Sequence, residues 1–195
     1  MYSLILLNGG VGARVAAGQP KQFVHVNGLP ILVYSLVAAD ATDGITQIVL
    51  NYPNGDVSPE RGACTDVVIR AMRAAGVDLQ KEVHEDITRN FTIYPQKWGL
   101  KKPDANIDHR RVPNLQTFFA RRGKAVPVTN DSADYKPGDI VSWDLNGKGL
   151  AHIGIVSNLW NERTKRYLVI HNIGRGAEAQ DVLFDWQITG HYRYF

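Results

Sequence analysis

Cysteine is almost missing from this chain of 195 residues, which holds only Cys64. One thiol cannot form an intrachain disulfide, so a hydrophobic core rather than cross-links must hold the fold together. A chain of this length can bury such a core. Cys64 is therefore either a small buried hydrophobic residue or a reactive thiol, and the functional interpretation depends on which of the two it is.

Long apolar runs are missing as well. No segment approaches the roughly 18 consecutive apolar residues that a membrane-spanning helix requires. The apolar run over 4–7 is too short for the core of an export signal, and no basic residue precedes it. We therefore expect no transmembrane segment, and a cytoplasmic protein if the sequence is taken as written.

A strong excess of charge of one sign is also missing. The 22 lysines and arginines against 19 aspartates and glutamates give a net charge of +3. Nucleic-acid-binding domains gather their basic residues on one face or in one run. The basic runs here are no longer than pairs such as Arg110-Arg111 and Arg121-Arg122. A nucleic-acid partner is therefore not expected.

The first 50 residues predict a β-loop-α-β unit. Strands are expected over 3–7 and 45–50, and a helix over 30–39. The first strand is followed by a glycine-rich loop, Asn8-Gly9-Gly10-Val11-Gly12-Ala13-Arg14. Residues 51–62 are rich in Pro, Gly, Asp and Asn, which indicates a loop between two parts of the chain. We expect two domains, over 1–50 and 51–195.

The rest of the chain predicts helices first and strands afterwards. Apolar residues at helical spacing indicate three helices, over 64–76, 79–91 and 114–122. Short apolar segments indicate strands over 140–143, 152–157, 167–171 and 191–195, the first two joined by a hairpin turn at 146–149. This order predicts an α+β fold in which N-terminal helices precede a C-terminal antiparallel sheet.

Three residues in this part carry the predicted chemistry. Cys64 begins the first helix, where free backbone N–H groups and a partial positive charge favour the thiolate and depress the thiol pKa. His152 opens one strand and His171 ends the next, so a hairpin-like pairing would set the two imidazoles side by side. Cys64 would be the nucleophile, His152 the base and later the acid, and His171 would orient the ring of His152. A purely structural role for each of the three remains an open alternative.

Residues 51–195 resemble a bacterial domain family of unknown function in the NlpC-like branch of the papain-type cysteine hydrolases. The stretches that carry the resemblance are 52–56, 62–68, 104–115, 136–139, 152–156 and 171–174. A Pro-Gly-Asp turn before a strand, followed by His-Ile-Gly-Ile, is the general NlpC-like signature. The resemblance implies a papain-like fold and a triad of Cys64, His152 and His171. It also implies that Tyr52, which precedes Cys64, helps to bind the oxyanion.

The resemblance further implies a cysteine peptidase or amidase that cleaves amide bonds, with peptides of peptidoglycan as the substrate. It requires no cofactor and no metal, and it suggests the periplasm or the cell envelope as the location. The polar loop of Asp108, His109, Arg110 and Arg111 would bind substrate, because arginine pairs bidentately with carboxylates such as those of cell-wall peptides. Internal salt bridging is the alternative role of this loop.

The first 50 residues resemble a different family, the 2-C-methyl-D-erythritol 4-phosphate cytidylyltransferases. In that family a glycine-rich loop, its arginine and a later lysine hold a nucleoside triphosphate, because backbone N–H groups and cations suit phosphates. The corresponding residues are Gly9, Gly10, Gly12, Arg14 and Lys21. The resemblance stops near residue 50, before the rest of the sheet and the metal-binding carboxylates of the family. We expect a truncated segment that neither turns over nor tightly binds nucleotide.

The sequence leaves two further alternatives for the cysteine and the histidines. Cys64, His152 and His171 could together bind zinc, although no second short-spaced ligand pair supports such a site. The same three residues could also be structural parts of a non-catalytic scaffold. The main prediction remains a cysteine-dependent amide hydrolase, and nucleotide binding or cytidylyl transfer by residues 1–50 is the alternative activity.

Overall fold

The computed structural model divides the chain into two compact units, residues 1–58 and 59–195. The residues that it describes are 2–7, 25–26, 29–30, 45–51 and 62–195. Among the helices of this described part, none combines the length and the apolar character needed to cross a bilayer.

Two strand pairs make up the described part of the first unit. β1 (Tyr2–Leu7) pairs in parallel with β4 (Ile45–Asn51), which confirms the two strands predicted there. β2 (His25–Val26) pairs antiparallel with β3 (Leu29–Pro30). Parallel pairing of β1 and β4 requires a crossover between them, as the predicted β-loop-α-β order does.

Several predictions for this region fall on residues outside the described part. Pro30, at which the predicted helix was expected to begin, belongs to β3, and the remainder of that helix lies outside the described residues. The same holds for Tyr52 and for the candidate phosphate-binding residues Gly9, Gly10, Gly12, Arg14 and Lys21. The predicted roles of these residues stay predictions.

Three helices open the second unit: α2 (Cys64–Ala74), α3 (Leu79–Asn90) and α4 (Val112–Arg121). They match the three predicted helices to within a few residues at their ends. α4 begins before the predicted Asn114 because Pro113 fits the first turn, where its missing N–H costs no hydrogen bond. Asp78 caps α3 by accepting a hydrogen bond from the Lys81 N–H.

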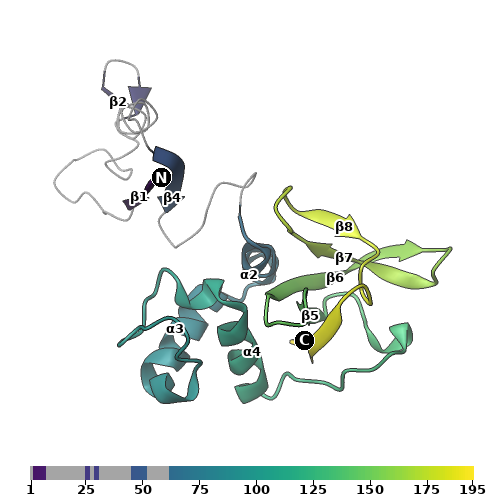
Figure 1. Cartoon of the computed structure of the whole chain (residues 1–195). Helices are drawn as coiled ribbons and strands as arrows, with labels where there is room; N and C mark the ends of the chain where they lie inside the picture. Colours follow the sequence, from purple (N-terminus) through teal and green to yellow (C-terminus); the bar gives the residue numbers. More distant parts are fainter. Residues whose placement is uncertain (1, 8–24, 27–28, 31–44, 52–61) are drawn as a thin grey trace. The chain divides into compact units, whose positions relative to one another are not determined.

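A five-stranded antiparallel sheet follows the helices in the order β8-β7-β6-β5-β9. Its strands are β5 (Ile140–Asp144), β6 (Ala151–Asn161), β7 (Arg166–His171), β8 (Glu178–Gln180) and β9 (Gln187–Tyr192). Figure 1 shows α2, α3 and α4 gathered beside this sheet. The second unit is therefore an α+β fold with helices first and an antiparallel sheet afterwards, as the sequence predicts.

The last strand differs from its predicted position. β9 begins at Gln187 and ends at Tyr192, whereas the apolar pattern indicated 191–195. Gly190 interrupts the pattern, but it lies within the strand. A Cβ at Gly190 would stand 2.2 Å from the Tyr192 hydroxyl oxygen and 2.8 Å from Ser142 Oγ, so the close approach of these side chains requires glycine.

The sheet separates two hydrophobic cores. The helix-facing core joins α2, α3 and α4 to Ile140 and Ile153 of the sheet. The opposite core contains Trp143, Val156 and Leu183. Because successive side chains of a strand point to opposite faces, His152 faces the opposite core, while its neighbour Ile153 faces the helices.

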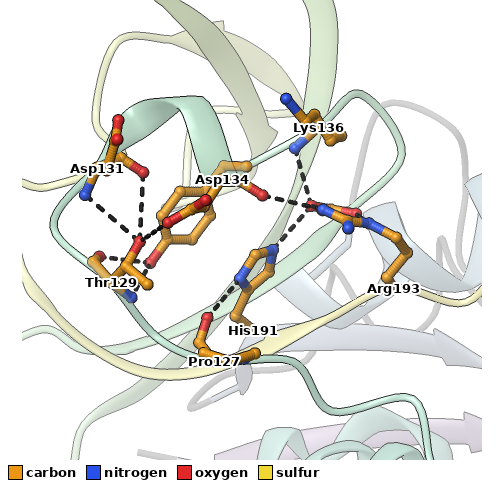
Figure 2. A network of polar contacts seen from close by, with 9 residues as sticks. Pro127, Thr129, Asp131, Asp134, Lys136, His191 and Arg193 are labelled. Carbon is orange, nitrogen blue, oxygen red and sulfur yellow. Dashed lines mark hydrogen bonds and ion pairs between the residues drawn. The ribbon is translucent and has the colours of Figure 1, made fainter.

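A buried polar network ties the turn before β5 to the end of β9 (Figure 2). The Asp139 carboxylate accepts hydrogen bonds from His191 Nε2 at 2.7 Å, from the Arg193 guanidinium at 2.6 and 2.8 Å, and from the Lys136 N–H at 2.8 Å. The other ring nitrogen of His191 lies 3.0 Å from the Pro127 carbonyl oxygen. This network fixes the turn that directs β5 into the sheet.

Candidate active site

Cys64 is the first residue of α2, as the sequence predicts, and it is half-buried against the helix-facing core. Backbone N–H groups of Ile153, Thr65 and Cys64 itself form hydrogen bonds that favour its thiolate. The contact from the backbone of Ile153, the residue after His152, places the sulfur beside the start of β6. The helix start and the beginning of β6 therefore meet at the thiol.

The predicted depression of the Cys64 pKa is wrong. Burial raises the pKa of the Cys64 thiol above its ordinary value, and the three backbone hydrogen bonds, which lower it, do not offset this effect. The negative charge of Asp66 raises the pKa further. The helix start supplies the stabilising N–H groups that were expected, but loss of water around the sulfur outweighs them. Cys64 is therefore a neutral thiol at neutral pH.

The two imidazoles meet as predicted. His152 Nε2 and His171 Nδ1 lie 2.9 Å apart, and the rings are 3% and 1% exposed. The contact follows from the antiparallel pairing of β6 and β7, which sets His171 opposite Gly154. The Trp186 ring lies 5.9 Å from both imidazole rings and covers the pair. A Cβ at Gly154 would lie 3.1 Å from that of His171, so glycine leaves room for the pair.

His152 is a neutral ring at neutral pH. Burial, and to a smaller extent the neighbouring His171, together lower its pKa to about 4. In the part of the chain that the structure describes, no hydrogen bond joins the Cys64 sulfur to the His152 ring, and none engages His152 Nδ1. Nδ1 is therefore the ring atom of His152 that is left to take a proton.

Two side chains that the sequence analysis did not identify complete this arrangement. Gln180 of β8 places its Oε1 2.8 Å from His171 Nε2. Asn172 donates a 2.7 Å hydrogen bond to the Gly62 carbonyl, and its Oδ1 accepts bonds from the Gly174 and Gly176 N–H groups. Asn172 thereby ties the segment before Cys64 to the loop after His171. An Asn followed by Gly two residues later is a turn signal that could have indicated this role.

The four residues predicted to bind substrate do not form one surface. Asp108 and His109 are 2% and 1% exposed. Asp108 accepts from the Asp104 N–H at 2.9 Å and lies 3.1 Å from His84 Nδ1. These contacts are the internal bonding that the sequence analysis left open as the alternative role of this loop.

Arg110 and Arg111 point in different directions. Arg110 forms a 2.9 Å ion pair with Asp66, whose carboxylate also accepts from the Ala63 N–H at 2.6 Å. Arg110 is thus brought to the start of α2, beside Cys64. The guanidinium of Arg111 lies over the Trp98 ring, 4.1 Å from its centroid, and burial lowers its pKa.

The described residues do not show the zinc site that Cys64, His152 and His171 could have formed. Within the described residues, no group of three or more His, Cys, Asp or Glu side chains is placed to hold a metal ion. His152 Nε2 and His171 Nδ1 instead face each other, so these two nitrogens are engaged in their mutual contact.

The chain is similar to known proteins of two kinds. One kind is the 2-C-methyl-D-erythritol 4-phosphate cytidylyltransferases. The enzyme of Clostridium beijerinckii is 29% identical over 133 residues, which cover 64% of this chain and 56% of that protein. An enzyme of Clostridium perfringens is 40% identical over 53 residues, 27% of this chain and 24% of that protein. The chain thus spans about half or less of these enzymes.

A relative of the other kind is more similar to this chain. The uncharacterized protein YijF of Escherichia coli (strain K12) is 61% identical over 148 residues, which cover 76% of this chain and 71% of that protein. No solved structure gives a significant match. The family model described as "Domain of unknown function (DUF1287)" matches residues 41–194. Because that match covers most of the sequence, the chain belongs to the DUF1287 family.

Proposed function

We propose that this protein is a papain-like, NlpC-type cysteine hydrolase that cleaves amide bonds. The observation that carries the proposal is that the start of α2, which holds the thiol, lies against the start of β6, which holds the base. The Cys64 sulfur accepts a hydrogen bond from the Ile153 N–H, and the adjacent His152 is bonded at 2.9 Å to His171. A nucleophile, a base and a third group that orients the base are the parts that nucleophilic catalysis requires.

The pKa directions define how the proposed reaction begins. Cys64 and His152 are both neutral at neutral pH, because burial raises the first pKa and lowers the second. His152 Nδ1 therefore takes the thiol proton as the sulfur attacks the substrate carbonyl carbon, and a C–S bond forms. The proton then passes to the leaving nitrogen as the C–N bond breaks. Water, activated by the same nitrogen, hydrolyses the thioester and restores the thiol.

The oxyanion of this reaction needs hydrogen-bond donors near the sulfur. The backbone N–H groups of Cys64 and Thr65 already point at that sulfur, so they surround the place where the reacting carbonyl would lie. We assign Tyr52 as a further donor on the resemblance to NlpC-like enzymes. Removing one such donor typically costs about 10²–10³-fold in rate.

The proposed substrates are peptides of peptidoglycan in the cell envelope. This assignment rests on the resemblance to NlpC-like hydrolases. Arg111 is the candidate contact for a substrate carboxylate, because its guanidinium lies over Trp98 and pairs with no carboxylate in the contacts described above. Arg110 is already paired with Asp66, so we assign it to the support of the Cys64 segment.

A peptide digest tests the proposal directly. The full chain is incubated with peptidoglycan fragments, and the products are identified by mass spectrometry. Cys64→Ala and His152→Ala should each lose at least about 10²-fold in rate. The matched control is His84→Gln, because His84 lies outside the site and is partly exposed; it should cleave like the parent chain. Cleavage that persists unchanged in Cys64→Ala would exclude Cys64 as the nucleophile.

A second candidate function belongs to residues 1–50. The 40% identity over 53 residues to a cytidylyltransferase favours a nucleotide-binding segment with Gly9, Gly10, Gly12, Arg14 and Lys21 around the phosphates. Calorimetric titration of the full chain with CTP and magnesium tests this candidate. Binding that Lys21→Ala abolishes would establish it.

A further inference from the structure

The polar chain that begins at His152 continues beyond His171 into β8. His171 Nε2 lies 2.8 Å from Gln180 Oε1, and Gln180 Nε2 donates a 2.9 Å hydrogen bond to Glu178 Oε2. β8 pairs with β7 so that Glu178 stands opposite His171 and Gln180 opposite Val169. Residues 178 and 180 share a face of the strand, and both therefore reach the His171 side of the sheet.

Glu178 determines which end of the Gln180 amide faces His171. An ionised carboxylate only accepts hydrogen bonds, so it holds the NH₂ group of Gln180. The amide oxygen of Gln180 is then turned toward His171 and can only accept. His171 must accordingly carry its proton on Nε2, which leaves a lone pair on Nδ1.

The same reasoning applies to the next hydrogen bond, between His171 and His152. His171 Nδ1, as an acceptor, requires a proton on His152 Nε2, 2.9 Å away. A neutral imidazole carries one N–H, so the lone pair of His152 must lie on Nδ1. The reverse order would require His171 to hold two protons. That would place a positive charge on His171, which is only 1% exposed.

The geometry points to Gln180, held by Glu178, as the positioning residue that sets the tautomer of His152. Four side chains from three strands are linked by hydrogen bonds in the order Glu178, Gln180, His171 and His152. Each one fixes which atom of the next side chain donates and which accepts, as far as the base. This inference rests on the proposed function, in which His152 Nδ1 takes the proton of Cys64. With the opposite tautomer, Nδ1 would carry a hydrogen and could not accept that proton.

Substitution of Gln180 by a residue that can only donate a hydrogen bond should reverse the donor-to-acceptor direction of the hydrogen bonds that lead to His152. The Gln180→Lys ammonium would donate to His171 Nε2, His171 would be protonated on Nδ1, and His152 would be protonated on Nδ1 as well. Position 180 is only partly buried, so a lysine has access to solvent there. The matched control is Gln187→Lys, because Gln187 is an exposed strand residue outside the chain of four.

Nitrogen NMR of isotope-labelled histidine side chains reads the tautomers without any substrate. The signals of His152 and His171 are assigned from His152→Gln and His171→Gln variants. We expect His152 to be protonated on Nε2 in the parent chain and in Gln187→Lys, and on Nδ1 in Gln180→Lys. Amide hydrolysis by Gln180→Lys should fall by about 10²-fold or more in kcat, with the melting temperature close to that of Gln187→Lys.

Two results would overturn the inference: His152 protonated on Nδ1 in the parent chain, or a tautomer that Gln180→Lys leaves unchanged. If Gln180→Lys does not fold, Gln180→Met takes its place. Met removes the acceptor at similar length and should give a mixture of both tautomers. A parent chain with the expected tautomer but without hydrolysis would contradict the proposed function while supporting the role of Gln180.

Discussion

Replacing Asp139 by asparagine should destabilise the second unit by several kcal/mol. Asp139 is 2% exposed, and its carboxylate is the common partner of His191, Arg193 and the Lys136 N–H. Asp139→Asn keeps the shape but removes the charge and turns an NH₂ group toward these donors. Breaking a buried ion pair by removing one partner typically costs about 3–5 kcal/mol. That is a large part of the roughly 5–15 kcal/mol that stabilises a typical domain.

The pKa of Asp139 gives a second, pH-dependent contribution to the free energy of unfolding. Burial alone would raise the pKa of Asp139, but the bonds from His191, Arg193 and the Lys136 N–H lower it from 3.8 to about 2. At about 1.36 kcal/mol per pH unit, this difference contributes about 2.5 kcal/mol of stability at neutral pH. The folded pKa is depressed, so the contribution is present above about pH 4 and declines as pH falls toward about 2. About half of it remains at about pH 3.

Urea unfolding followed by tryptophan fluorescence measures both effects. The difference in unfolding free energy between the parent chain and Asp139→Asn should be about 3–5 kcal/mol at about pH 7 and about 1 kcal/mol smaller at about pH 3. Glu162→Gln is the control, because the Glu162 side chain is 79% exposed; it should change stability by less than about 0.5 kcal/mol. A difference for Asp139→Asn below about 1 kcal/mol, or one independent of pH, would refute this reasoning.

Three further outcomes are expected. Alkylation of Cys64 by iodoacetamide should have a midpoint at or above the ordinary thiol value of about 8.5, because burial raises the thiol pKa; a midpoint well below that value would restore the depressed pKa expected from the helix start. Gly154→Ala should lower unfolding free energy in a urea titration by about 1–3 kcal/mol, because its Cβ would lie 2.9 Å from the Ile170 carbonyl oxygen and from Val169 Cγ1; unchanged stability would contradict that contact. Calorimetry with CTP and magnesium should detect no micromolar binding, because a match of 53 residues covers only 24% of a cytidylyltransferase. Micromolar binding lost in Lys21→Ala would prove this expectation wrong.

Local signals carried most of what could be predicted about the fold. Helical spacing of apolar residues placed α2 and α3, and the Pro-Gly-Asp and Asn-Gly turns placed the strands that follow them. The juxtaposition of His152 and His171 was predictable because it needs only two consecutive antiparallel strands. β8 was not predicted, since Glu178–Gln180 is only three residues long, has polar residues at both ends and forms a strand by pairing with β7.

The parts of the site that escaped prediction depend on contacts between distant segments. The sign of the Cys64 pKa change is set by burial beneath β6, whereas the helix start, which is visible in the sequence, acts in the other direction. The dense polar loop at Asp108 and His109 has the composition of an exposed surface, yet both side chains are buried. Composition reports what a segment could contact, and only the packing of the helices decides what it does contact.

The Asn172 side chain has a consequence for how the site opens. Its amide holds the Gly62 carbonyl on one side and the Gly174 and Gly176 N–H groups on the other. Neither segment can separate from the sheet without breaking bonds to the same side chain, so the two form one cooperative opening unit. Hydrogen exchange at the Gly174 and Gly176 amides would therefore measure the rate at which the backbone before Cys64 separates from Asn172. The exchange rate of these two amides would thus report how often the segment before Cys64 opens, although the loop itself carries no thiol.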